Sequence, residues 1–443
     1  MNRRKFLHHT SWMAAGTCVL PGLLQSCKPL DWEQEGQFQG EVIIVGAGIA
    51  GLYAGELLLK QGVRVKILEA ESFWGGRLRS LPQTTDSIKN AERKTIHGEF
   101  SVLHDLLRKS LVSMPPKIGS ELYYFNGLLN PDYDAIQNTF FSEMLAAINS
   151  LGTYEGSDIT AQTYFDALDL SPNVASVFNV LTGQEYGTSS DRISTLGISR
   201  QKQLWSSGSA IFTASTHDIQ QSFESALSSS LGVVQYNVVV TSIDYSGEII
   251  QVTDSNGGLH SCDRLLITVP LHTLQRSAIS FTPALGNTRE TAFNRIGIDT
   301  SYCALFKLEE AVWPAGTKRI IGSDIVQSFE VTDEGWVYAE VSGTQAQILA
   351  SIFGDPLTII QNQFNELYPG IMEIITEGAY HFWEGNRSYD LSGVGNSRQT
   401  IAEPIAGKLY FAGEATHTGG HHGTLHGAME TAFRAVTEIV KNN

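Results

Sequence analysis

The chain has 443 residues, of which 42% are hydrophobic and 17% are charged, a composition that excludes a disordered protein and permits large buried cores. Its 30 lysines and arginines against 46 aspartates and glutamates give a formal net charge of −16, which argues against nucleic acid as a partner. At about 150 residues per domain, this length favours more than one domain, and two interleaved domains fit it.

The N-terminus has the features of an export signal. An Arg-Arg-Lys-Phe-Leu run spans residues 3–7, a modestly apolar run spans 12–24, and no acidic residue precedes Cys27. The paired arginines resemble a twin-arginine signal, and the Leu-Gln-Ser-Cys run that ends at Cys27 resembles a lipobox. The alternative, an uncleaved anchor, fits less well because the apolar run is shorter than the ~20 residues of a spanning helix. We expect residues 1–26 to be removed and Cys27 to be lipidated, which attaches the protein to the bilayer on the periplasmic or cell-surface side of a bacterial membrane.

The four cysteines exclude a disulfide scaffold. Cys18 lies in the signal and Cys27 at the lipidation site, so Cys262 and Cys303 remain as one candidate pair. There is no Cys-x-x-Cys motif, and a structural zinc site is not indicated.

A polar linker over 27–40 leads into a β-α-β pattern. A β-branched strand is predicted over 41–45, an amphipathic helix over 49–61 and a second strand over 63–68. This order, with a glycine-rich turn between the first strand and the helix, is typical of a unit that binds a dinucleotide.

The turn has the Gly-x-Gly-x-x-Gly spacing. Gly46 permits the tight turn, Gly48 lets the backbone approach a pyrophosphate, and Gly51 lets the helix pack closely on the strand. Glu69 follows Gly48 by 21 residues, where a carboxylate accepts hydrogen bonds from a ribose 2′-hydroxyl. The phosphates are expected at the positive end of the helix.

Two further motifs carry a family resemblance. Gly75-Gly76-Arg77 follows the second strand, and near the C-terminus Phe-Ala-Gly-Glu-Ala-Thr at 411–416 precedes Gly-Thr-Leu-His-Gly-Ala at 423–428. Together they resemble the flavin-containing amine oxidase superfamily, especially its polyamine-oxidase and histone-demethylase-like branch. The resemblance implies non-covalent FAD held by Gly46, Gly48, Gly51, Glu69, Gly75, Gly76, Arg77, Val240, Gly413, Glu414, Thr424 and Leu425.

Because these motifs lie more than 300 residues apart, the FAD domain must be discontinuous. The expected fold class is α/β, with a Rossmann-type FAD-binding domain and an interleaved α+β substrate domain. The FAD domain is expected over 41–114, 221–285 and 401–443. The substrate domain is expected over 115–220, mainly helical, and over 286–400, where period-two runs predict a sheet.

The resemblance also implies an activity, that of an FAD-dependent amine oxidase-like oxidoreductase. Hydride would pass from the C–N bond of a small amine to flavin N5, and molecular oxygen would reoxidise the flavin to give hydrogen peroxide. Tyr389 and Trp383 match aromatics that stand over the flavin in relatives, and Thr424 replaces the second tyrosine of monoamine oxidases. Each aromatic could equally belong to the core.

Three serines depart from the family pattern. Ser301 stands where many members have a strand lysine that holds a water near N5, and Ser101 stands where amino-acid oxidases carry an arginine. Ser388 lies near the position of a flavin-linking cysteine, in accord with non-covalent FAD. Ser301 keeps two alternatives open: a flavin desaturase or isomerase of a lipophilic substrate, and a non-catalytic protein that binds FAD.

Four histidines cluster near the C-terminus, namely His417, His421, His422 and His426. Glycines flank these histidines, and no carboxylate nearby has a spacing that would complete a set of metal ligands. Structural or flavin-facing roles are therefore favoured, and no metal site is predicted. One of them could serve as an acid or base near neutral pH. Glu99 is a further candidate at the substrate site, with a surface position as the alternative.

Overall fold

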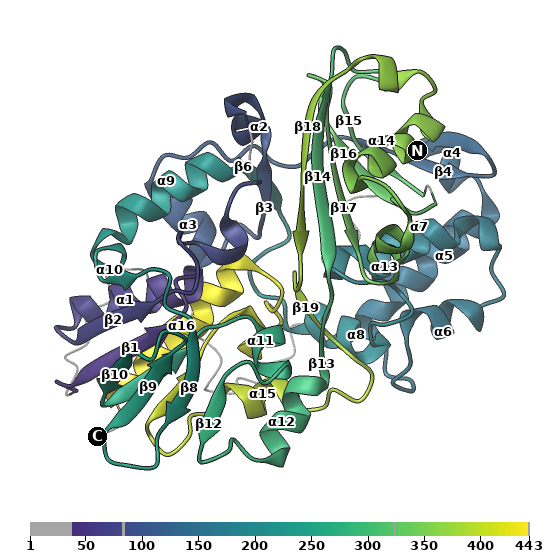
Figure 1. The fold of residues 1–443 in the computed structure, drawn as a ribbon. Helices are drawn as coiled ribbons and strands as arrows, with labels where there is room; N and C mark the ends of the chain where they lie inside the picture. Colours follow the sequence, from purple (N-terminus) through teal and green to yellow (C-terminus); the bar gives the residue numbers. More distant parts are fainter. Residues whose placement is uncertain (1–37, 82–84, 323, 442–443) are drawn as a thin grey trace.

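The computed structural model describes residues 38–81, 85–322 and 324–441, so the signal and the lipidation site at Cys27 lie outside the described residues. In the described part of the chain, no helix has the length and apolar character needed to cross a bilayer. The molecule has two halves, one built on a parallel sheet with α1 and α16, the other on a long seven-stranded sheet (Figure 1).

The parallel sheet has β1 at its centre and the order β20-β11-β1-β2-β7. Its neighbouring strands are all parallel. The strands are β1 (Glu41–Val45), β2 (Arg64–Leu68), β7 (Val234–Gln235), β11 (Arg264–Ile267) and β20 (Leu409–Phe411). Distant parts of the chain thus share one sheet, and this confirms the Rossmann-type α/β class expected from the βαβ pattern.

Helices cover one face of this sheet. Helix α1 (Ile49–Lys60) is buried from Ile49 to Leu58 because α16 (Leu425–Lys441) packs along it, and both contribute to one apolar core. The other face is covered by a second sheet of order β10-β9-β8-β12. Its strands are β8 (Val240–Asp244), β9 (Ile250–Asp254), β10 (Leu259–Cys262) and β12 (Ser280–Thr282). Other helices of this half are α2 (Asp86–Ala91), α3 (Val102–Lys109), α9 (Thr216–Ala226) and α10 (Ser228–Leu231).

The second half is organised around a sheet of order β18-β14-β17-β16-β15-β4-β5. Its strands are β4 (Ser120–Phe125), β5 (Leu128–Pro131), β14 (Ser301–Leu308), β15 (Thr317–Ile321), β16 (Ser328–Val331), β17 (Trp336–Ser342) and β18 (Ile375–Trp383). The helices expected between 115 and 220 are α4 (Asp132–Ile136), α5 (Thr139–Ser150), α6 (Ala161–Asp166), α7 (Ala175–Thr182) and α8 (Thr195–Leu204). Strands β4 and β5 fall in that expected helical region and join the sheet by parallel pairing of β4 with β15.

The two faces of the seven-stranded sheet differ in chemistry. One face carries apolar side chains such as Phe306 and Phe329, which pack under α13 (Thr344–Ser351) and α14 (Pro356–Leu367). The opposite face is mixed, because it carries Glu121, Arg319 and Glu330 in register together with buried apolar side chains such as Ile321 and Leu305. Arg319 Nε lies 2.9 Å from Glu121 Oε1. One face of the sheet is therefore buried under α13 and α14, while the other combines a charged cluster with two further apolar clusters.

Short elements connect the halves. Strand β3 (Arg93–His97) pairs with β6 (Ile211–Ser215), and β13 (Ile296–Ile298) pairs with β19 (Ser388–Asp390). Helices α11 (Leu271–Gln275), α12 (Asn287–Asn294) and α15 (Ser397–Ala402) pack beside the second pair (Figure 1).

The disulfide considered for Cys262 and Cys303 is wrong, because both are free, buried thiols. Cys262 ends β10 in the half that contains the parallel sheet, whereas Cys303 lies within β14 of the other half. Burial raises the pKa of each thiol to about 12.

Candidate active site

The glycine-rich turn at the start of α1 has the geometry that its spacing predicts. Gly46 has φ of +107°, and a Cβ on Gly51 would lie 2.0 Å from the Gly46 carbonyl oxygen. A Cβ on Gly48 would meet no atom of the described chain within 4 Å. In that same part of the structure no side chain caps the helix, so no side chain satisfies the first N–H groups of α1. An anion fits this position.

The second glycine pair lies against the first. Gly75 N donates a hydrogen bond to Ala47 O at 2.9 Å, and Gly48 forms an isolated parallel bridge with Gly75. Both Gly75 and Gly76 have positive φ, a conformation that glycine adopts without strain. The chain thereby places Arg77 next to the α1 turn.

Glu69 ends β2 and turns its carboxylate toward the same turn. Its oxygens accept hydrogen bonds from Ala47 N at 2.6 Å and Glu71 N at 3.0 Å. Burial raises the pKa of Glu69, and these backbone donors oppose that rise. Val238 N donates to Glu69 O at 2.8 Å, which brings the start of β8, where Val240 is buried, beside it. The residues expected at the adenosine end therefore lie close together.

Glu414 is the centre of a buried polar network. Arg77 Nη1 lies 2.8 Å from its Oε1, and Ser388 Oγ and Gly423 N donate to its Oε2 at 2.6 and 2.8 Å. Burial alone would raise the pKa of Glu414, but the Arg77 guanidinium and the hydrogen bonds from Ser388 and Arg77 outweigh it and lower the pKa to about 2. Arg77 also donates to the carbonyl of Asn386.

Arg398 adds a donor that the sequence did not reveal. Its Nη1 donates to Ser388 Oγ and Ala415 O, both at 2.9 Å, and its Nε pairs with Asp390 at 2.7 Å. Its Nη2 is buried and finds no hydrogen-bond partner among the described residues. A helix N-terminus without a side-chain cap and two glycine-rich turns that meet fit an anionic dinucleotide such as FAD.

Two residues expected at the catalytic centre meet on the seven-stranded sheet. Ser301 of β14 pairs directly with Trp383 of β18. Ser301 is fully buried, and its Oγ has no hydrogen-bond partner within the described chain. Trp383 is half-buried and contacts His381 edge to face, with ring centroids 4.2 Å apart. Substrate contact by either residue stays a prediction.

Tyr389 lies apart from that pair, on β19. Its ring packs over Gly297, its hydroxyl donates to Asp299 Oδ2 at 2.8 Å, and Arg192 Nε donates to the hydroxyl at 2.9 Å. Only 1% of the residue is exposed. Protein groups therefore engage both the ring and the hydroxyl, in keeping with a core aromatic, and a role against substrate stays a prediction.

The N-terminus of α16 is set by Thr424. Its Oγ1 accepts a hydrogen bond from Gly427 N at 3.0 Å and donates to His421 O at 2.6 Å. Leu425 begins the helix and is half-buried. Because Gly423 N binds Glu414, this first turn lies beside the buried polar network.

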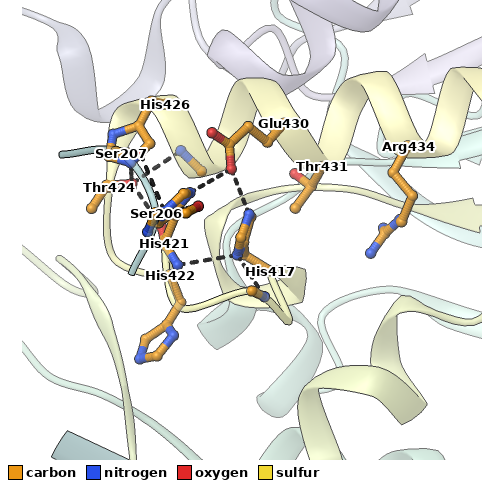
Figure 2. A network of polar contacts seen from close by, with 12 residues as sticks. Ser206, Ser207, His417, His421, His422, Thr424, His426, Glu430, Thr431 and Arg434 are labelled. Carbon is orange, nitrogen blue, oxygen red and sulfur yellow. Dashed lines mark hydrogen bonds and ion pairs between the residues drawn. The ribbon is translucent and has the colours of Figure 1, made fainter. Parts of the chain in front are cut away.

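The histidines divide into two groups (Figure 2). His417 and His421 both contact Glu430. The sequence did not single out Glu430, because a glutamate inside a helical pattern is usually a surface residue. Among the described residues, the hydrogen bonds to Glu430 from histidine come from His417 and His421 and not from His422 or His426. Burial lowers the pKa of His422 and of His426 to about 3, which makes both weak bases at neutral pH.

Ser101 and Glu99 have local structural contacts. Ser101 caps α3 by accepting a hydrogen bond from His104 N at 3.2 Å. Glu99 accepts from Ala210 N at 2.9 Å, which joins it to the start of β6.

Comparisons with known proteins agree with this geometry. The family described as flavin containing amine oxidoreductase matches residues 206–440, and the NAD(P)-binding Rossmann-like domain family matches 44–108. Lysine-specific histone demethylase 1B of Mus musculus is 23% identical over 90% of this chain and 52% of its own length, so the chain spans about half of that relative.

Two relatives are matched along their whole length. (S)-6-hydroxynicotine oxidase of Paenarthrobacter nicotinovorans is 23% identical over 90% of this chain and 99% of its own. The solved structure of cyclohexylamine oxidase from Brevibacterium oxydans superposes with a TM-score of 0.73 at 18% identity, covering 91% of this chain and 99% of the other. The chain therefore belongs to the flavin-containing amine oxidoreductase family, as an FAD-dependent oxidoreductase that holds its cofactor non-covalently.

Proposed function

We propose that the protein oxidises the C–N bond of a small amine and passes the electrons to molecular oxygen. The observation that carries this proposal is the whole-length match to (S)-6-hydroxynicotine oxidase, whose 99% coverage leaves almost no part of that oxidase without a counterpart here. The proposed overall reaction consumes amine, oxygen and water, and yields a carbonyl compound, ammonia or a smaller amine, and hydrogen peroxide.

The chain's own residues would bind and orient the reactants. FAD, when bound, supplies the acceptor for the hydrogen and two electrons of the C–H bond next to nitrogen. Gly48 and Gly75 would allow the backbone to approach the phosphates, and Arg77 and Glu414 would fix the neighbouring loops. Ser301 and Trp383 would face the substrate from the sheet.

The face of the sheet that carries Ser301 has polar groups as well as apolar ones such as Leu305 and Trp383. Glu340 of β17 is opposite Cys303 in the sheet, two residues from Ser301 on the same face. Glu340 Oε1 accepts hydrogen bonds from Arg387 Nη2 at 2.6 Å and Asn386 Nδ2 at 2.9 Å. A small amine with an apolar body and a hydrogen-bonding nitrogen suits such mixed neighbours.

Ser301 motivates a second candidate function. Its small hydroxyl is buried without a partner in the described structure, and it is shorter than a lysine side chain and carries no charge. A flavin desaturase or isomerase that acts on a lipophilic substrate without using oxygen would tolerate this change. The first candidate is preferred because the match to (S)-6-hydroxynicotine oxidase extends over 99% of that oxidase.

The test uses the purified, FAD-loaded protein with polyamines, monoamines and amino acids, and measures flavin bleaching without oxygen and peroxide with oxygen. Amine-dependent bleaching followed by one peroxide per amine consumed is the expected result. Bleaching only by a lipophilic donor, with no peroxide, would favour the desaturase or isomerase. A flavin that no donor bleaches would favour a binding protein. Ser301→Ala is the variant to compare with the parent protein, because it removes only the hydroxyl of Ser301. It should still bind FAD, since that hydroxyl has no partner in the described chain.

We also propose that the protein is exported folded and is held on a bacterial membrane by a lipid on Cys27. The support is the twin-arginine pattern at residues 3–7 and the lipobox-like run that ends at Cys27. Export after folding suits a protein whose cofactor site joins both ends of the chain.

A further inference from the structure

The loop that leads into α16 holds two histidines against one carboxylate oxygen (Figure 2). His417 Nε2 lies 2.6 Å and His421 Nδ1 lies 2.7 Å from the same atom, Glu430 Oε2. These three side chains bring their ligand-type atoms within 4.8 Å of one another, an arrangement that could hold a metal ion. The hydrogen bonds at the far side of each ring decide between a metal site and a hydrogen-bond network.

In His417 the far nitrogen is an acceptor. Its Nδ1 receives hydrogen bonds from Gly419 N at 3.0 Å and from His421 N at 3.1 Å. Because a backbone N–H can only donate, Nδ1 must be without a proton. A neutral His417 therefore carries its proton on Nε2, which donates to Glu430.

In His421 the roles of the two nitrogens are exchanged. Its Nε2 accepts a hydrogen bond from Ser206 N at 3.2 Å, so its proton is on Nδ1, and Nδ1 donates to Glu430. Each ring thus presents an N–H, and not a lone pair, to the carboxylate. A ligating histidine normally donates through its other nitrogen, and here both other nitrogens face backbone donors. This hydrogen-bond pattern is the opposite of what a metal requires.

The same loop is tied to the cofactor network. Gly423 N donates to Glu414 Oε2 at 2.8 Å, and Thr424 Oγ1 donates to His421 O at 2.6 Å. Glu414 thus holds the end of the loop, while Glu430 holds its beginning and middle through His417 and His421. Burial would raise the pKa of Glu430, but the hydrogen bonds from both histidines outweigh it, so the pKa lies below its ordinary value and the carboxylate is ionised.

We propose that Glu430 is a positioning residue, which through His417 and His421 fixes the loop that presents Thr424 and Leu425 to FAD. The inference rests on the expected place of the flavin beside the first turn of α16. It assigns the histidine cluster a structural task in cofactor binding and no metal.

The first experiment separates the hydrogen bonds from the charge. Both imidazoles use one oxygen, so Glu430→Gln can still accept both hydrogen bonds through its carbonyl oxygen, whereas Glu430→Leu accepts neither. Glu438→Leu is the control, because it removes a carboxylate from the same helix, where Glu438 lies 3.6 Å from Arg434. The readouts are the FAD dissociation constant and the visible circular dichroism of bound flavin.

Glu430→Leu should weaken FAD binding at least tenfold and change the flavin dichroism, while Glu430→Gln and Glu438→Leu stay within threefold of the parent. Equal FAD affinity and identical dichroism in the two leucine variants would overturn the positioning role. If Glu430→Leu does not fold, a Glu430→Gln variant that weakens FAD binding tenfold would also overturn it, since the hydrogen bonds are retained.

The second experiment reads the protons directly. Nitrogen-15 NMR of labelled histidines at pH 7.5 should show His417 protonated on Nε2 and His421 on Nδ1. Titration with zinc chloride should leave both resonances in place. One tightly bound zinc ion per chain that is lost in His417→Ala would overturn the inference. These readouts do not depend on amine turnover, so a protein that oxidises no amine could still support the inference, and an active oxidase could contradict it.

Discussion

The residues at the candidate cofactor site fall into two groups: those that a sequence motif predicts and those whose contacts only the fold reveals. Glu414 was predicted because it stands in a motif, and its ion pair with Arg77 follows from two motifs that share a ligand. Arg398 and Glu430 were not predicted, because each lies inside a helical pattern and gains its role only from contacts across loops. A motif singles out residues such as Glu414, whereas contacts that form only in the fold are not visible in the sequence.

Glu414→Gln should show how much the buried ion pair stabilises the fold. The folded pKa of about 2 lies below the ordinary 4.5, so the carboxylate stabilises the fold fully above about pH 5 and loses this effect as the pH falls from 4.5 towards 2. At pH 7 we expect Gln to cost roughly 3 kcal/mol, because Arg77 loses its buried counter-charge.

Urea unfolding of the FAD-free protein between pH 7 and pH 3 measures this difference. The difference in unfolding free energy between the parent protein and Glu414→Gln should become smaller as the pH falls. Glu384→Gln is the control, since its pair with Arg276 is well exposed and is expected to contribute little at any pH. A difference in unfolding free energy that stays constant from pH 7 to pH 3 would contradict the assignment of the low pKa to Glu414.

Helices and strands were predicted where a local sequence pattern defines them, and they were missed where long-range pairing defines them. The first strand and α1 appear almost where their periodicity predicts them, and the sheet expected from period-two runs over 286–400 is present. Strands β4 and β5 were missed because β4 pairs with β15, almost 200 residues later, and no local pattern reports such a partner. Short strands inside a helix-rich region depend on tertiary pairing for their existence.

The N-terminus of α1 offers a paired prediction on two glycines. Gly51→Ala should destabilise the FAD-free protein by about 3 kcal/mol, because its Cβ would lie 2.0 Å from the Gly46 oxygen and the backbone must move. Gly48→Ala should leave that stability unchanged within about 1 kcal/mol, since φ of −70° suits alanine and no atom of the described chain lies within 4 Å.

FAD affinity separates the packing role of Gly51 from the cofactor-binding role expected for Gly48. Gly48→Ala should raise the FAD dissociation constant at least tenfold, because its methyl group occupies the space that the pyrophosphate approaches. Urea unfolding and FAD titration of both variants provide the check. Normal FAD binding by Gly48→Ala would mean that the cofactor does not approach this turn.

For the whole molecule, the discontinuous architecture followed from chemistry more than from composition. Motifs at both ends that need one ligand predicted a parallel sheet assembled from distant segments, and β1, β11 and β20 form it. The charged cluster on the other sheet was not predictable, because Arg319 pairs with Glu121 and Glu185 from separate parts of the chain. Pairing of this kind depends on the assembled fold.

The place of the whole molecule in the cell depends on Cys27. Each buried CH₂ of an acyl chain contributes about 0.8 kcal/mol to membrane attachment, so an acylated chain should pellet with membranes and a chain without acyl groups should not. Cys27→Ser should therefore move the protein from the membrane fraction to the soluble fraction or leave it unprocessed, while Cys18→Ser, a change within the signal itself, should not. Fractionation and intact mass of the mature protein measure this. A Cys27→Ser protein that stays on membranes, together with a parent protein that carries no acyl mass, would contradict lipid anchoring.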